Sequence, residues 1–121
     1  MAGVNKIILV GHIGKDPDLR YLTGDVPVLS FPLATSDWIN KDGIKIEQTE
    51  WHNVVMWRTL AEAASRVLKK GTLIYLEGKI RTRSFVDKEG IKRYTTEIIP
   101  EQFTLLGMAG DLKEIPVVNH V

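Results

Sequence analysis

The sequence contains no cysteine, and this absence excludes a disulfide scaffold, a thiolate zinc site and a cysteine nucleophile. Histidine is also scarce: His12, His52 and His120 are scattered without the spacing of metal ligands, so no metal site is predicted. No apolar run approaches the roughly 20 residues of a membrane span, and the run of residues 7–10 is too short for the core of a signal peptide. We therefore expect a cytoplasmic protein.

Motifs for enzymatic chemistry are missing as well. Gly11 and Gly14 lie in Val-Gly-His-Ile-Gly-Lys, which lacks the spacing of a phosphate-binding loop or of a dinucleotide-binding fingerprint. The acidic residues are dispersed, and no motif sets a nucleophile beside a base. The sequence therefore predicts neither an enzyme nor a bound cofactor.

What is present is the size and balance of one globular domain, with 121 residues, 44% hydrophobic and 26% charged. The formal net charge is only +1, but residues 58–93 carry ten basic and four acidic side chains. A basic central segment suggests a polyanionic partner. A solvated lysine and arginine face that binds nothing explains the same charges, so charge alone does not decide.

Alternating apolar residues and turn signals predict an all-β chain. Residues 12–20 are expected to form a loop, and Lys41-Asp42-Gly43 forms the tip of a hairpin. In the second strand Leu29, Phe31 and Leu33 face the core. The predicted strands cover residues 5–11, 26–36, 47–57, 73–86 and 91–99, and residues 103–106 extend the sheet.

One stretch has the period of a helix instead, with an apolar face formed by Leu60, Ala63, Ala64, Val67 and Leu68. Thr59 and Glu62 have the spacing of a capping box, and Gly71 is placed as the C-terminal glycine. The order of elements is three strands, one helix and two strands. This order is typical of the OB-fold, a five-stranded Greek-key barrel with a short helix between strands three and four and here a long final hairpin. Other small barrels fit the same count. We expect the domain to span residues 1–106 and residues 107–121 to form a flexible tail.

Residues of equal parity share one face of a strand. By this rule Trp51 and Trp57 lie together, and Lys79, Arg81 and Arg83 follow one another along a single face. Taken alone, the tryptophans can be explained by packing in the core, and the cations by a solvent-exposed sheet face that binds nothing. Their occurrence together in one small sheet favours single-stranded nucleic acid, because bases stack on rings while cations follow the phosphates. Trp38, near the hairpin tip, adds to this interpretation.

Ordered blocks of sequence run from residue 4 to residue 106. They include Val4-Asn5-Lys6-Ile7-Ile8-Leu9-Val10-Gly11, Gly14-Lys15-Asp16-Pro17, Gln48-Thr49-Glu50-Trp51-His52, Tyr75-Leu76-Glu77-Gly78 and Arg93-Tyr94-Thr95-Thr96-Glu97. In this order they resemble the bacterial single-stranded DNA-binding protein family. The resemblance implies an OB-fold homotetramer that wraps single-stranded DNA without sequence preference and without catalysis, and that serves replication, recombination and repair at the bacterial nucleoid.

The same resemblance assigns residues. Base-stacking aromatics are expected at Trp38, Trp51, Trp57 and Phe85. Phosphate contacts are expected from Lys6, Arg20, Lys70, Arg81, Arg83 and Arg93, to which the parity argument adds Lys79. Subunit contacts are expected at His52 and at Asn5 and Ile7 of the first strand. Tyr75 is a candidate for a second interface, with stacking by its exposed ring as the rival interpretation.

The family usually ends in an acidic tip that recruits replication and repair proteins, whereas this sequence ends in Asn119-His120-Val121. The resemblance therefore leaves such recruitment in doubt. Two other functions fit an OB-fold with this composition. One is an adaptor whose sheet face binds protein, and the other is an RNA-binding module.

Overall fold

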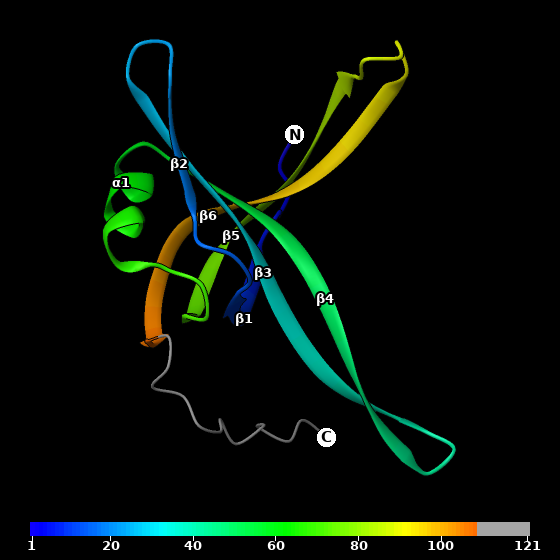
Figure 1. Ribbon diagram of the computed structural model, residues 1–121. Helices are drawn as coiled ribbons and strands as arrows, with labels where there is room; N and C mark the ends of the chain where they lie inside the picture. The colour runs from blue at the N-terminus through cyan, green and yellow to red at the C-terminus, as the bar shows by residue number, and fades with distance from the viewer. Residues whose placement is uncertain (109–121) are drawn as a thin grey trace.

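Six strands and one helix make up the chain in the computed structural model, which describes residues 1–108 (Figure 1). The predicted flexible tail lies outside the described residues from residue 109 onward. The elements are β1 (Ile7–Ile13), β2 (Asp18–Leu22), β3 (Val26–Lys41), β4 (Ile44–Trp57), α1 (Arg58–Val67), β5 (Leu73–Val86) and β6 (Lys92–Gly107).

Five of the strands close into a barrel in the order β1-β5-β6-β4-β3, and among the described strands β2 pairs only with β3. β1 closes the barrel because it pairs with β5 along most of its length and with β3 at His12 and Ile13. The backbones come very close at this closure, since a Cβ atom on Gly11 would lie 2.3 Å from the carbonyl oxygen of Ala34. The predicted five-stranded barrel with one short helix is confirmed.

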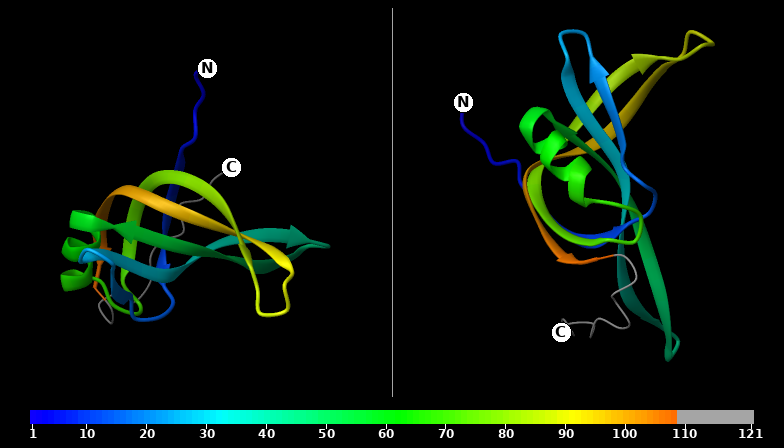
Figure 2. Two further views of the ribbon diagram at one scale, coloured as in Figure 1. Left: turned by 90° about the horizontal axis from the view of Figure 1, so that it is seen from above. Right: turned by 60° about the vertical axis from the view of Figure 1, so that its left-hand side comes forward.

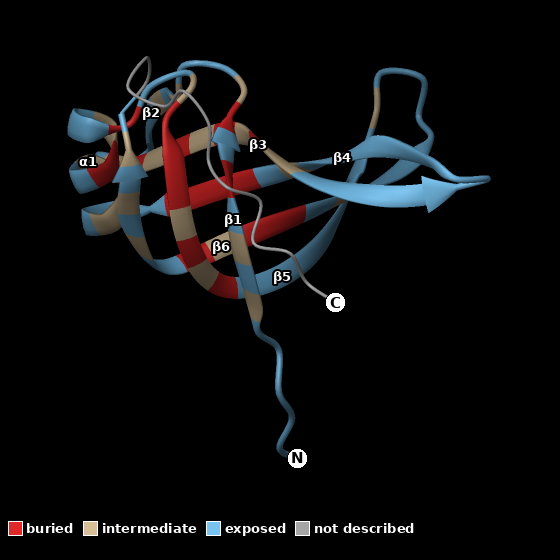
Figure 3. Cartoon of the chain, turned by 90° about the horizontal axis from the view of Figure 1, so that it is seen from below, coloured by how far each residue is buried: buried red, intermediate tan, exposed pale blue. Residues whose placement is uncertain are grey.

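Alternation of side chains builds the core, which Figure 3 shows as the buried bands of the barrel strands. The predicted core residues Leu29, Phe31 and Leu33 of β3 are at most 2% exposed. They pack with buried residues of the other barrel strands and of α1, among them Ile13, Val54, Met56, Ala61, Ala64, Ile74, Leu76 and Ile98.

Several predicted strand boundaries were wrong, since β1 continues to Ile13, β3 continues to Lys41 and β4 begins at Ile44. Residues 18–20 of the expected loop form β2 together with Tyr21 and Leu22, and this strand pairs with β3 from Asp18 opposite Ser30 to Leu22 opposite Val26. The two final segments are one strand, β6, whose register shifts between Glu77 and Gly78 of β5. Gly78 is required there, because a Cβ atom would lie 2.1 Å from the carbonyl oxygen of Ile99.

The helix lies where the sequence predicted it, but its predicted capping residues and part of its predicted buried face were wrong. α1 begins directly after β4 with Trp57 as N-cap and no side-chain capping bond, so the Thr59–Glu62 capping box does not form. It ends at Val67, with Leu68 as the C-cap whose N–H donates to the carbonyl oxygen of Ala64, and Gly71 lies beyond it with φ +88°. The buried helix residues are Ala61 and Ala64, whereas Ala63 and Val67 are exposed. No helix within residues 1–108 has the length and apolar character needed to cross a membrane.

Two long hairpins leave the barrel in different directions (Figure 2). We call residues 35–50 of β3 and β4 the β3–β4 arm, and residues 79–97 of β5 and β6 the β5–β6 arm. Most residues of both arms are exposed, as the pale blue ribbons of Figure 3 show. The arms therefore offer two faces each, one continuous with the inside of the barrel and one with its outer surface.

Candidate nucleic-acid interface

Three tryptophans lie on the outer face of β3 and β4. Opposite residues of an antiparallel pair share a face, and the register sets Trp51 opposite Ala34, Trp57 opposite Val28 and Trp38 opposite Glu47. They have the opposite parity to the core residues of the two strands, Leu29, Phe31 and Leu33 of β3 and Val54 and Met56 of β4, so the three rings point away from the core. Trp38, Trp51 and Trp57 are 48%, 62% and 40% exposed. Core packing, the alternative explanation for the tryptophans, is therefore wrong.

The ring of Trp51 lies directly over Gly14. A Cβ atom on Gly14 would be 2.5 Å from Cζ3 of Trp51, so only glycine leaves room for the ring in this position. A groove of about 440 Å³ opens beside it. The groove is lined by Lys15, Asp16, Asp18, Ser30, Phe31, Pro32, Trp51, His52 and Asn53. An exposed ring beside a shallow, partly polar groove is suited to stacking a flat base.

Arg20 lies in the same outer row as Trp57, because Val28 of β3 pairs with Arg20 on one side and with Trp57 on the other. Its Nε donates to Oδ2 of Asp18 at 2.8 Å. This predicted phosphate contact therefore lies beside a predicted stacking ring, and its charge is partly neutralised by a neighbour on its own strand.

The β5–β6 arm has a cationic face that ends in an aromatic ring. Lys79, Arg81, Arg83 and Phe85 occupy alternate positions of β5, and Phe85 is 43% exposed. The guanidinium of Arg83 lies 6.0 Å from the centroid of the Phe85 ring, a cation–π distance. Arg83 Nε also pairs with the buried Glu97 at 3.2 Å, whereas Lys79 and Arg81 form no ion pair within residues 1–108.

The turn of the same arm is held by Asp87. Its Oδ2 accepts a 2.8 Å bond from Nε of Arg93, and its Oδ1 accepts from the backbone N–H groups of Glu89 and Ile91. The Arg93 side chain and then the Ile91 N–H stabilise the carboxylate and lower the pKa of Asp87 below its ordinary 3.8. Arg93 therefore has a structural bond in the turn in addition to its predicted phosphate contact.

Two further predicted cations lie on the barrel. Lys6 pairs with Oε2 of Glu77 at 3.2 Å, and the Tyr75 hydroxyl donates to the same oxygen. The backbone N–H of Lys70 donates to Oδ1 of Asp16, at the rim of the Trp51 groove, while its side chain is in none of the ion pairs of the described chain.

Acidic side chains on these surfaces neutralise cations. Within residues 1–108 no group of three or more His, Cys, Asp or Glu side chains is placed to hold a metal ion. The carboxylates of Asp18, Glu77, Asp87 and Glu97 each bind one lysine or arginine. Four of the seven predicted phosphate contacts are thus already bonded to a carboxylate.

The residues predicted for subunit contacts have different surroundings. Nε2 of the half-buried His52 lies 2.8 Å from Oγ1 of Thr35. Asn5 bonds to Ile80 through both ends of its side-chain amide, and Ile7 packs against the core. The exposed residues of β1 are Ile8, Val10 and His12, and the two apolar ones are 55% and 48% exposed.

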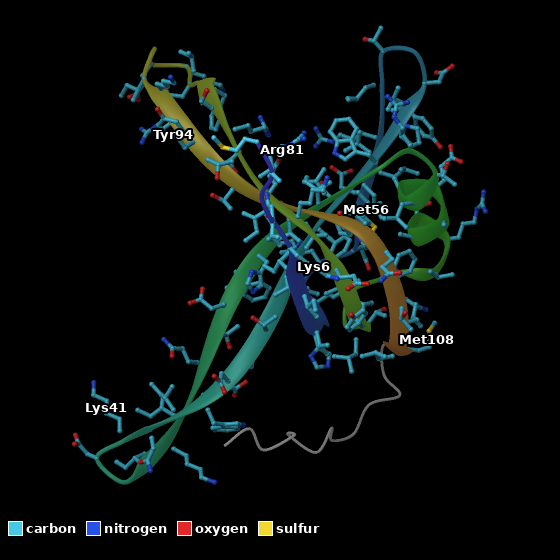
Figure 4. All side chains as sticks on the ribbon, turned by 180° about the vertical axis from the view of Figure 1, so that it is seen from behind. Lys6, Lys41, Met56, Arg81, Tyr94 and Met108 are labelled. Atoms are coloured by element: carbon cyan, nitrogen blue, oxygen red, sulfur yellow. The ribbon has the colours of Figure 1, made fainter. Side chains whose placement is uncertain are left out.

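Tyr94 was missed as a functional candidate. It lies on β6 of the β5–β6 arm (Figure 4), and its side chain is 67% exposed, slightly more than that of Trp51. Lys92 Nζ lies 5.6 Å from the centroid of its ring. The alternation of residues along 92–98 is the sequence signal that places Lys92 and Tyr94 on one face.

Comparison with known proteins gives one consistent result. The sequence profile described as "Single-strand binding protein family" matches residues 4–106. A Single-stranded DNA-binding protein 1 of Xylella fastidiosa is 46% identical over 122 residues, covering 99% of this chain and 90% of that protein. A single-stranded DNA-binding protein of Neisseria meningitidis is 45% identical over 105 residues, and this chain spans 60% of its length.

A solved structure supports the same relationship. The chain superposes with a TM-score of 0.82 on a Plasmodium falciparum SSB in complex with ssDNA, at 27% identity and with 88% and 97% of the two chains covered. With a family profile that matches most of the chain and relatives at 45–46% identity, this chain belongs to the Single-strand binding protein family.

Proposed function

We propose that this chain binds single-stranded DNA without sequence preference, by stacking bases on Trp38, Trp51, Trp57 and Phe85. The observation that carries the proposal is the exposure of three tryptophans on one outer face, because tryptophan is a residue that globular proteins bury on average. Stacking contributes about 1–3 kcal/mol per base, a range for which OB-fold single-strand binders are the standard example. Two stacked rings would already outweigh one exposed ion pair.

The names of the relatives support this function. The Xylella and Neisseria proteins are single-stranded DNA-binding proteins, and the Plasmodium structure is a complex with ssDNA. Every base presents a π-face, so stacking tolerates any sequence. The proposal therefore includes general protection of single strands in replication, recombination and repair at the nucleoid, with no catalytic step.

Phosphate contacts form the second part of the proposal. Lys79 and Arg81 are the predicted phosphate contacts of the β5–β6 arm that form no ion pair in residues 1–108, and Lys70 lies close to the Trp51 groove. Lys6, Arg20, Arg83 and Arg93 would have to share or exchange a carboxylate. Counterion release from the strand then makes affinity fall with salt.

The test is a fluorescence titration with oligothymidine, with a duplex and with oligouridine of equal length. We expect tryptophan quenching, preference for oligothymidine over both competitors, and a loss of about 1–3 kcal/mol in Trp51→Ala. An adaptor that binds protein would show no preference for single strands, and an RNA module would bind oligouridine more tightly. Either result contradicts the proposal.

We also propose a homotetramer. Within residues 1–108 one edge of β1 is unpaired along residues 7–11, since β1 meets β3 only at His12 and Ile13. Ile8 and Val10 expose apolar surface beside this edge, and Tyr75 lies opposite Val10 on β5. An open strand edge with apolar side chains is a ready site for a second copy. Light scattering at micromolar concentration should give the tetramer mass, and a monomer would contradict the proposal.

A further inference from the structure

The β5–β6 arm has a second face, which carries an aromatic ring of its own. Tyr94 of β6 lies opposite Ser84 of β5, so it shares a face with Ser84 and not with the neighbouring Phe85. Its exposed fraction of 67% is larger than the 43% of Phe85. The ring therefore has an accessible surface, on the side of the arm turned away from Arg81 and Arg83.

The charges of this second face differ from those of the first. The even-numbered positions of residues 80–86 and 92–98 hold Lys92 and no carboxylate. On the first face and the turn, Glu97 and Asp87 each bind an arginine. A phosphate near Tyr94 would thus meet a cation and no competing carboxylate on that face, and Lys92 Nζ is 5.6 Å from the ring centroid.

The neighbours of the ring are small and polar. Thr82 and Thr96 lie opposite each other on the same face, with their hydroxyl oxygens 3.2 Å apart, and Ser84 follows them. Small side chains beside an exposed ring leave room for a flat base to lie on it.

Both edges of the arm are open, so one strand of DNA can pass from one face to the other. β1 pairs with β5 only up to Gly78, and the Asn5 side chain adds a contact at Ile80. β4 pairs with β6 only at Ile98. Beyond these points the arm is a two-stranded ribbon with no further partner strand among the described residues.

We propose that Tyr94 and Lys92 form a second base-stacking site, on the face of the β5–β6 arm opposite to Phe85. The ligand is the same single strand of DNA, which crosses an edge of the arm after leaving Phe85, stacks a base on Tyr94 and sets a phosphate near Lys92. This inference rests on the proposed function, and it adds a residue and a path for the strand that the tryptophan face does not include.

The experiment compares Tyr94→Leu with Tyr94→Phe in the full chain. Leucine removes the ring and keeps apolar bulk, whereas phenylalanine keeps the ring, and Val86→Ala on the same face controls for loss of exposed apolar surface. With oligothymidine of about 16 nucleotides, near the upper site size of one OB fold, we expect Tyr94→Leu to weaken binding about fivefold or more. Tyr94→Phe and Val86→Ala should bind like the parent.

A second readout locates the base. Oligothymidine carrying 5-iododeoxyuridine should cross-link on irradiation to the peptide that contains residue 94, and mass spectrometry should find this product lost in Tyr94→Leu. Equal affinities of Tyr94→Leu and the parent, or no cross-link at residue 94, would overturn the inference. If Trp51→Ala still weakens binding in that case, the proposed function survives and only the second site fails.

The competing explanation is that Tyr94 is a contact between copies of the chain. Light scattering separates the two, because Tyr94→Leu should leave the mass unchanged. A smaller mass for this variant, with the parent's affinity at concentrations where both are assembled, would assign Tyr94 to a protein interface and overturn the inference.

Discussion

The close contact between the Trp51 ring and Gly14 can be tested with Gly14→Ala, which adds one methyl group. In Gly14→Ala the new Cβ atom would lie 2.5 Å from Cζ3 and 2.9 Å from Cη2 of the ring, where ordinary contacts begin at 3.4 Å. The ring must therefore move by roughly 1 Å. The backbone of Gly14 is not in the left-handed region, and its N–H donates to Pro32 at 2.9 Å, so alanine fits the backbone itself.

The expected loss of affinity follows from the stacking that we propose for the Trp51 ring. A displaced ring overlaps its base less well, so Gly14→Ala should lose up to the about 1–3 kcal/mol that removal of a stacked ring costs. No charge changes, so the slope of affinity against salt should stay the same. Affinity should thus fall equally at low and high salt.

The assay is oligothymidine binding by Gly14→Ala, Trp51→Ala and the double variant. If Gly14 acts only through Trp51, the alanine at position 14 has no further effect once the ring is gone. Gly3→Ala is the matched control, since nothing lies within 4 Å of its Cβ position. Full affinity in Gly14→Ala, or additive losses in the double variant, would refute the reasoning.

Three further predictions test separate parts of the structure: the cationic face of the β5–β6 arm, its turn, and the bulge at Gly78. Arg81→Ala should reduce the slope of log affinity against log salt concentration by about 0.7, the value for one phosphate in a single strand. Arg83→Ala should reduce this slope by less, because the buried Glu97 already binds the Arg83 side chain. Equal reductions in the two variants would argue that the ion pair does not weaken the phosphate contact of Arg83. The pKa of Asp87 is lowered, chiefly by Arg93, so the carboxylate's stabilisation of the turn is complete above pH 3.8 and is lost as pH falls through the lower folded-state pKa. An NMR titration of the Asp87 carboxyl carbon should therefore have its midpoint below pH 3.8. A midpoint at or above pH 3.8 would contradict the hydrogen bond between Asp87 and Arg93. Gly78→Ala should lower the free energy of unfolding by about 1–3 kcal/mol, because the new Cβ atom would lie 2.1 Å from the carbonyl oxygen of Ile99 in β6. A denaturant midpoint equal to that of the Gly3→Ala control would exclude this steric clash.

The sequence was most informative where one face of a strand is buried. In β3 the alternation of Leu29, Phe31 and Leu33 with polar or small residues reports burial directly, because a period of two is a property of the strand itself. β2 gave no such signal. Of its five residues only Leu19 is shielded and packs against the core, so the strand has almost no buried face and Asp16-Pro17 suggested a loop instead.

The ends of α1 depend on tertiary structure. Capping rules assume a loop before the helix, but β4 continues directly into α1, and Arg58 takes a positive φ of 59° at the junction. The Thr59 hydroxyl therefore does not cap the helix. The rotation of the helix on the barrel then decides that Ala61 is buried and Ala63 exposed, which the spacing of apolar residues alone did not show.

The sequence predicted which side chains of the candidate site share a strand face, but it did not predict which of them form ion pairs. Parity placed Trp51 with Trp57, and it placed Arg81 with Arg83, because each pair lies on one strand. The pairing of Arg83 with Glu97 joins two strands, and it follows only from the register that sets Glu97 opposite Arg81. A register cannot be read from one strand at a time.

These ion pairs determine which interactions dominate DNA binding. A phosphate that binds an arginine already held by a carboxylate replaces one anionic partner by another, so it gains less than a phosphate that neutralises an isolated cation. The pairs formed by Lys6, Arg20, Arg83 and Arg93 therefore make the electrostatic contribution smaller than the number of basic side chains suggests. Within residues 1–108 the tryptophan rings are exposed, and the stacking proposed for them involves no charge and would not weaken with salt. Affinity at high salt should thus depend mainly on the rings, while the cations that form no ion pair in the described chain set the steepness of the salt dependence.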